Sequence, residues 1–272
     1  MSNRAVTVEA KHIFLDIVNY TYGRSIEAQT ELIIILNKIV RLSIRKGNIK
    51  SENVIYIPTG DGMCISIINK HNPYDIHLST AIDILRQLYE HNKSTEDEMR
   101  RFILRIGINE NYDNLIVDIN KQKNISGSGI NFAARILTLC DANQILISNT
   151  VFDKLVQREK YLQSFKNYVG EVKHGVKLSV YQYKNHDLHF LNNNIPIAFA
   201  PRISPTIKLN ELVAYYLSNC IIHEDFIINN LHQTRGQYSL TYLLFHLAED
   251  DLEKSKVTKT KPRPYIETSS NT

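Results

Sequence analysis

Residues 53–68, NVIYIPTGDGMCISII, contain two short apolar runs, Asn53–Pro58 and Gly62–Ile68, joined by a Thr-Gly-Asp-Gly turn. β-Branched and aromatic residues favour strands in both runs, and the glycines favour a tight reversal. Parallel strands need a crossover of about a dozen residues, so strands joined this closely pair antiparallel. Phe102–Ile108 and Asn114–Asp118 form a second closely joined pair. The sequence therefore predicts a largely antiparallel sheet.

Three longer segments have the apolar spacing of amphipathic helices. They are Arg24–Lys46, Pro73–His91 and Ile130–Leu139. A polar loop, Ile119–Ser128, precedes the third helix. Helices packed on an antiparallel sheet make an α+β sandwich, which is the predicted fold class.

The composition changes after Tyr183. We expect a main domain at residues 1–184 and an Asn- and Pro-containing linker at residues 185–208. Short apolar periodic segments predict a helical C-terminal extension at residues 209–253. Residues 254–272 are rich in Lys, Thr, Ser and Pro, and we expect a disordered tail there.

The overall composition excludes several classes of protein. Hydrophobic residues make up 43% of the 272 residues and charged residues 22%, which is typical of a globular chain. No apolar run approaches the ~20 residues of a membrane helix, and the N-terminus lacks a signal-peptide core, so we expect a cytoplasmic protein without a membrane partner. A net charge of +4 and a basic tail with few aromatics give little support for a nucleic-acid partner. Three widely spaced cysteines exclude a disulfide framework.

Two aspartates occupy positions that suit metal chemistry. Asp16 ends the first predicted strand, Lys11–Asp16, and Asp61 lies in the glycine turn. Gly60 and Gly62 permit a close approach of a ligand to the backbone. If the two strand ends are neighbours, the carboxylates would form a two-metal site for Mg²⁺ or Mn²⁺, suited to phosphoryl chemistry. Taken singly, each is more often an ordinary turn or strand-end aspartate.

Asn131 and Arg135 are four residues apart on the third predicted helix and project from one face. An amide and a guanidinium there would orient a ribose and neutralise a phosphate. Taken alone, the pair is more often a solvated helix face. The preceding Ser-Gly-Ser-Gly at residues 126–129 resembles a phosphate loop, although it has no lysine.

Several motifs occur together in an order that is specific. They are FLDIVNYT (14–21), IPTGDGMCI (57–65), RIGINE (105–110), GSGINFAARI (127–136) and VKHGVKLSVYQY (172–183). The set resembles the class III nucleotidyl cyclase catalytic domain over residues 11–183. The resemblance implies a ferredoxin-like antiparallel sandwich, a nucleoside triphosphate substrate, and a homodimer with active sites across its interface.

The resemblance also implies roles for individual residues. Asp16 and Asp61 look like the ligands of two divalent cations, Mn²⁺ or Mg²⁺, with Ile17 lending its backbone carbonyl. Asn131 and Arg135 look like the transition-state pair, contributed by the opposite subunit. Lys173 or Lys177 would reach the triphosphate, and Lys173 is preferred. The remaining residues assigned to substrate binding are Phe14, Ile57, Gly60, Arg105 and Asn124.

The base specificity depends on two positions. In the family, adenylyl cyclases read the purine with a lysine and an aspartate, whereas guanylyl cyclases use glutamate and commonly cysteine. The equivalents here are Ile57 and Asn124, which match neither pair. The polar middle stretch, residues 118–131, looks like that of the compact bacterial cyclases, which include the pyrimidine cyclases of Pycsar anti-phage systems. We therefore predict a cyclase of UTP, with CTP as the second choice, whose product is read by a separate cyclic-nucleotide-binding effector.

Two rival hypotheses stay open. One is an adenylyl cyclase that makes cAMP through unusual base contacts. The other is a non-catalytic nucleotide-binding module that signals through its C-terminal helices. The presence of Asp16, Asp61, Asn131 and Arg135 together argues against the second, because a silent module would tolerate their loss.

Overall fold

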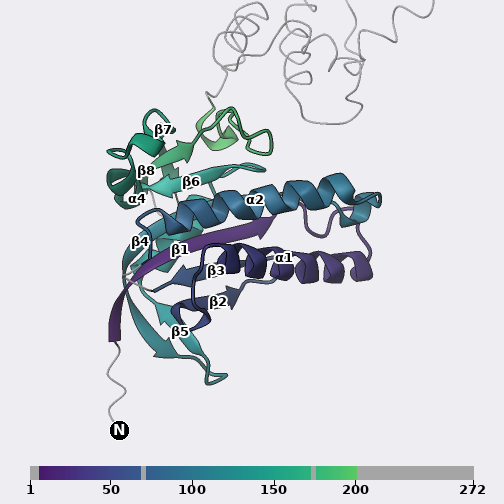
Figure 1. Ribbon diagram of the computed structural model, residues 1–272, viewed down its shortest axis with the longest axis horizontal. Coiled ribbons are helices and arrows are strands. Elements are labelled where there is room, and N and C mark those ends of the chain that lie inside the picture. Colours follow the sequence, from purple (N-terminus) through teal and green to yellow (C-terminus); the bar gives the residue numbers. More distant parts are fainter. Residues whose placement is uncertain (1–5, 69–71, 173–175, 201–272) are drawn as a thin grey trace, which may run out of the picture. The chain divides into compact units, whose positions relative to one another are not determined.

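A computed structural model describes residues 6–68, 72–172 and 176–200 of the chain (Figure 1). Its sheet has eight strands: β1 (Val6–Ile17), β2 (Val54–Pro58), β3 (Gly62–Ile67), β4 (Leu104–Val117), β5 (Lys123–Ser126), β6 (Ile145–Ser148), β7 (Phe165–Val172) and β8 (Val176–Tyr183). Four α-helices accompany it: α1 (Ile26–Lys46), α2 (Ile76–Ser94), α3 (Ser128–Leu137) and α4 (Asn149–Leu155). The predicted α+β fold class is confirmed.

The strand order is β2-β3-β1-β4-β6-β8-β7, and β5 pairs with β4 beside this path. The predicted hairpin of β2 and β3 is present and antiparallel. β4 and β6 are parallel, however, so the sheet is mixed rather than antiparallel throughout. The reason is that α3 connects these two strands and supplies the crossover that parallel pairing requires.

β4 also differs from the prediction made from the sequence. The two strands predicted within residues 102–118 are one continuous strand, which pairs with β1 from Val6↔Leu115 to Ile17↔Leu104. Its polar middle contains Asn109, Asn111 and Asp113, residue types that favour turns. Their side chains find partners on α3, as described below, and the strand therefore continues. The predicted loop at residues 119–128 contains β5 and the first residue of α3.

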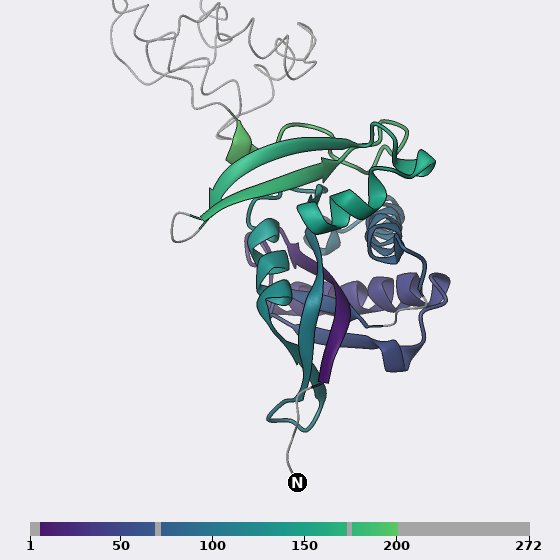
Figure 2. The ribbon, with the colours of Figure 1, turned by 90° about the vertical axis from the view of Figure 1, so that its left-hand side faces the viewer.

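The two faces of the sheet are covered by different helices. α1 and α2 lie side by side over one face, and α3 lies over the other (Figures 1 and 2). Ser25 caps α1 by accepting a hydrogen bond from the Ala28 amide at 3.2 Å. Alternate residues of β1, Ile13, Leu15 and Ile17, are buried in the core under α1 and α2. The intervening residues of β1 therefore face α3.

The compact unit that contains the sheet extends to Phe199. Within the range expected to be a linker, the Asn194 carbonyl accepts hydrogen bonds from Gln144, which precedes β6, and from Gln182 on β8. The expected helical extension and tail lie outside the described residues. In the parts of the chain that are described, no helix has the length and apolarity needed to cross a bilayer.

Candidate active site

Asp16 and Asp61 lie side by side at one end of the sheet. Asp16 is the penultimate residue of β1 and pairs with Gly62 on β3 and Arg105 on β4. The Ile17 amide donates a hydrogen bond to the Asp61 carbonyl at 3.0 Å, which holds the turn against the end of β1. A Cβ at position 62 would lie 2.1 Å from the Leu15 carbonyl oxygen, so this approach requires glycine. The predicted neighbourhood of the two aspartates is therefore present.

Arg105 is the cation of this carboxylate pair. Its Nη2 and Nε donate to Asp16 Oδ2 at 2.7 and 3.0 Å. Burial raises the pKa of Asp16 above its ordinary value, Arg105 opposes that rise, and the neighbouring Asp61 side chain adds to it. Among the described contacts the guanidinium pairs with Asp16 and not with Asp61, so one cation faces two adjacent carboxylates and negative charge is in excess at the strand ends. Gly60 in the same turn has φ +97°, a conformation that favours glycine.

α3 packs closely on the sheet face that carries Asp16. A Cβ at Gly107 on β4 would lie 2.7 Å from the Ala133 carbonyl oxygen, so helix and strand backbones are nearly in contact. Asn131 and Arg135 are exposed on the side of α3 opposite its buried residues, which are Gly129, Ala133, Ile136 and Leu137. The helix therefore presents the predicted transition-state pair outward, away from the sheet of its own subunit.

The two positions predicted to read the base lie on β2 and β5, which contact each other. Ile57 on β2 packs at the edge of a small apolar cluster that includes Ile125 on β5 and Ile130 on α3. Asn124 precedes Ile125 on β5, and its Oδ1 accepts a hydrogen bond from the Ile125 amide at 2.7 Å. Phe14 lies two residues before Asp16 and therefore on the same face of β1. The side chains of Lys173 and Lys177 lie outside the described residues.

Comparisons with known proteins identify the family of the domain. The family model of the adenylate and guanylate cyclase catalytic domain matches residues 4–191. The chain belongs to this family. Among solved structures, the guanylyl cyclase Cya2 is 16% identical with a TM-score of 0.57, covering 72% of this chain and 99% of that one. The adenylyl cyclase CyaB from P. aeruginosa is 18% identical with a TM-score of 0.51, covering 66% and 96%.

A third structure, the guanylate cyclase domain of RhGC from Catenaria anguillulae in complex with GTP, is 19% identical with a TM-score of 0.51 and covers 66% of this chain and 98% of that one. At these low identities the similarity shows the fold of the cyclase domain and not the substrate. No curated protein matches the sequence.

The cyclase family implies divalent cations, and the residues at the strand ends fit them. Asp16 and Asp61 offer hard carboxylate oxygens, and the carbonyl of Ile17 is a further oxygen at the same strand end. A bound cation would neutralise the excess negative charge of the two carboxylates. No group of three or more His, Cys, Asp or Glu side chains suited to a metal occurs in the described part of the chain. A metal there would rely on two carboxylates, the backbone and the substrate phosphates, as Mg²⁺ commonly does.

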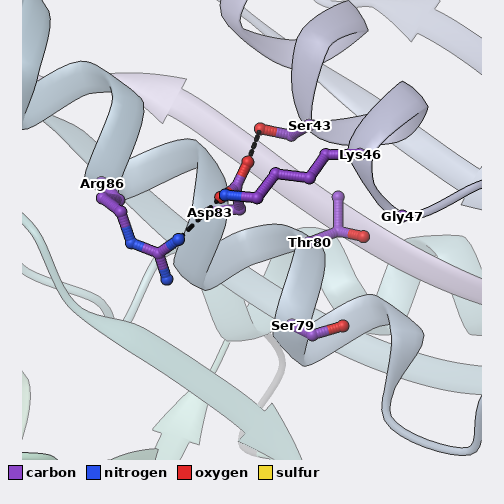
Figure 3. A pocket seen from close by; sticks show the side chains of 7 residues that line it. All are labelled: Ser43, Lys46, Gly47, Ser79, Thr80, Asp83 and Arg86. Carbon is purple, nitrogen blue, oxygen red and sulfur yellow. Dashed lines mark hydrogen bonds and ion pairs between the residues drawn. The ribbon is translucent and has the colours of Figure 1, made fainter.

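A cavity of about 240 Å³ lies between α1 and α2, on the opposite face of the sheet (Figure 3). Its charges are already paired, because Asp83 accepts hydrogen bonds from Lys46 at 2.6 Å, Ser43 at 2.9 Å and Arg86 at 3.0 Å. The predicted site residues with described side chains are not among those that line it. The cavity is therefore separate from the candidate active site.

The interpretation of residues 126–129 as a phosphate loop is wrong. The backbone amides of Gly129 and Ile130 at the start of α3 donate to the Asp113 carboxylate at 3.0 and 2.9 Å. These are the groups that would otherwise bind a phosphate at a helix N-terminus. Asp113 belongs to none of the motifs that predicted the site. Its only signal was an acidic residue in register with Asn109 and Asn111 on one side of a strand.

Proposed function

We propose that this domain cyclises a pyrimidine nucleoside triphosphate, UTP in preference to CTP, to its 3′,5′-cyclic monophosphate and pyrophosphate. The observation that carries the proposal is the carboxylate pair Asp16 and Asp61 at the strand ends of a cyclase domain whose purine-reading positions hold Ile57 and Asn124. The carboxylate pair suits the metal-dependent reaction. The proposed base-reading positions lack the charged side chains that the family uses for purines.

Cyclisation forms a bond between the ribose 3′-oxygen and the α-phosphorus and breaks the bond to the β-phosphate oxygen, while the 3′-hydroxyl loses its proton. Asp16, Asp61 and the Ile17 carbonyl would hold the divalent cations, which when bound acidify the hydroxyl and neutralise the phosphates. Arg105 balances the charge of Asp16 and fixes its orientation. Lys173, or Lys177 in its place, would bind the triphosphate.

Asn131 would orient the ribose, and Arg135 would stabilise charge that develops on the α-phosphate. Loss of such a group typically costs about 3–4 kcal/mol of barrier. Both residues point away from the sheet of their own subunit. This direction supports a homodimer in which α3 of one subunit completes the carboxylate site of the other.

The pyrimidine preference is supported by the environment of Ile57. Its side chain belongs to an apolar cluster and offers no hydrogen bond to a purine edge. Sites built on hydrogen bonds discriminate between substrates by about 10⁴ or more, whereas apolar walls give about 10- to 200-fold. Asn124, Arg105 and the β4–β5 turn would supply the polar groups for the smaller ring.

We further propose that the product is a second messenger in anti-phage defence, read by a separate effector that binds cyclic nucleotides. The resemblance of residues 118–131 to the bacterial Pycsar cyclases supports this role. Such a signal would be made in the cytoplasm, where nucleoside triphosphates are abundant.

The test is to incubate the full chain separately with ATP, GTP, CTP and UTP, each with Mn²⁺ and with Mg²⁺, and to identify the products by mass. We expect cyclic UMP to dominate. Preferred turnover of ATP would favour the adenylyl alternative. Binding of nucleotide without turnover of any of the four would favour the non-catalytic module.

A further inference from the structure

Asp113 is a buried carboxylate on β4 that joins the sheet to the first turn of α3. Its side chain is 1% exposed. Oδ1 accepts the Gly129 amide at 3.0 Å, and Oδ2 accepts the Ile130 amide at 2.9 Å. A carboxylate at this position also interacts favourably with the helix dipole. The same side chain thus satisfies two backbone donors that the start of a helix leaves without partners.

The same carboxylate also lies beside His12 of β1. His12 Nε2 lies 3.1 Å from Asp113 Oδ2, without the alignment of a hydrogen bond, and His12 Nδ1 lies 2.8 Å from Ser66 Oγ on β3. Burial lowers the pKa of His12, which Asp113 only partly offsets. His12 thus lies between Asp113 on β4 and Ser66 on β3.

The glycines of the Gly-Ser-Gly segment leave room for this carboxylate. A Cβ at Gly127 would lie 2.1 Å from Asp113 Oδ1, and one at Gly129 would lie 2.7 Å from Oδ2. Two asparagines of β4 add contacts, because Asn109 donates to the Gly129 carbonyl at 2.8 Å and Asn111 donates to Ser128 Oγ at 3.0 Å. The segment is therefore shaped around the polar side chains of β4.

One more contact connects the segment held by Asp113 to the predicted transition-state pair. Asn131 Nδ2 donates to the Gly127 carbonyl at 3.0 Å, so the position of Gly127 sets the direction of the Asn131 amide. Arg135 follows one helical turn later on the same rigid helix. β4 also carries Arg105, which contacts Asp16. One strand thus connects the carboxylate site of a subunit to the helix that this subunit offers to its partner.

We propose that Asp113 is a positioning residue that fixes the first turn of α3 and thereby aligns Asn131 and Arg135 for the reaction. The inference rests on the proposed cyclase function, since alignment matters only if these two residues act on substrate. Asp113 itself does not touch the substrate; it acts through the backbone of residues 127–130. Small displacements of catalytic groups are costly, because about 1 Å of misplacement can lower a rate about 100-fold.

The experiment compares Asp113→Ala, Asp113→Asn and Gly127→Ala with wild type in full-length protein. Steady-state kinetics with the preferred triphosphate give kcat and KM, and thermal unfolding reports folding. Ser25→Ala is the matched control, because it removes a helix cap on α1, which carries none of the predicted site residues.

We expect Asp113→Ala to lower kcat about 100-fold while KM changes by less than about 3-fold, since the triphosphate is bound mainly by the other half of the site. Asp113→Asn keeps one acceptor oxygen and should recover part of kcat. Gly127→Ala keeps the carboxylate but intrudes on it and should resemble Asp113→Ala. Ser25→Ala should leave kcat unchanged.

Unchanged kcat in a folded Asp113→Ala variant overturns the positioning role and leaves the proposed function intact. The role is also overturned if kcat falls, KM rises and thermal stability falls together in Asp113→Ala, with no recovery in Asp113→Asn. That pattern indicates a structural role alone. Absence of turnover by wild type overturns the proposed function, and the positioning role of Asp113 with it.

Discussion

The face of the sheet under α1 and α2 differs in chemistry from the face under α3, although both are built from the same strands. Along β1, Ile13, Leu15 and Ile17 enter the apolar core of the first face. The alternate residues His12 and Asp16 contact charged or polar partners on the second face. The period of two in a strand allows one segment to supply a stable core and a reactive surface at once.

The two faces also differ in how completely their carboxylates are paired with cations. In the cavity between α1 and α2, Asp83 accepts hydrogen bonds from two cations and a hydroxyl, so its charge is compensated within the chain. At the strand ends, Arg105 pairs with Asp16, and no cation contacts Asp61 among the described residues. This difference supports the proposed cation site on the second face.

The largest effect is expected from Asp61→Ala. Removing this carboxylate takes away a proposed metal ligand and no core packing, so cyclase activity should fall by about 10³-fold or more with the fold intact. Mn²⁺ at about 100 times its Kd should stabilise wild type by about 2.7 kcal/mol in thermal unfolding but stabilise the variant much less. Near-normal product formation in Mn²⁺ by the variant would contradict the metal assignment.

A second experiment asks whether the outward face of α3 serves another subunit. Mixing inactive Asp61→Ala and Arg135→Ala proteins should restore about a quarter of wild-type activity, because half of randomly formed dimers contain one complete site of two. The control mixes each variant with itself. A mixture that stays inactive although heterodimers form, or a fully active wild-type monomer, would exclude a shared site.

A smaller effect, on stability rather than chemistry, is expected on the other face. Leu32 of α1 is fully buried in the core, and Leu32→Ala should lower the free energy of unfolding by about 2–5 kcal/mol. The kcat of the folded fraction should stay at the wild-type value. Urea denaturation and kinetics below the unfolding transition check this, and a large loss of kcat would show that the two faces are not independent.

The parts of the fold that could be predicted from the sequence depend on local signals. The Thr-Gly-Asp-Gly turn and its flanking strands placed Asp61, and the end of the first apolar run placed Asp16. Helix ends were predicted to within a few residues because apolar periodicity and caps are local properties.

The continuity of β4 and the role of Asp113 could not be predicted in this way. Asn109, Asn111 and Asp113 are turn formers by residue type, and only their contacts with α3 make a strand favourable there. The parallel pairing of β4 with β6 likewise depends on how α3 packs. Long-range contacts of this kind leave no periodic signal in a single sequence.

The central claim is that the α3 face forms a cyclase site for a pyrimidine base, and a competition assay tests it most directly. Wild type and Ile57→Lys are each given an equimolar mixture of ATP, GTP, CTP and UTP, and the cyclic products are quantified by mass spectrometry, which compares kcat/KM values. We expect cyclic UMP to exceed both purine products for wild type, and Ile57→Lys to reduce it and to admit ATP. Excess cyclic AMP from the wild-type protein would contradict the pyrimidine assignment.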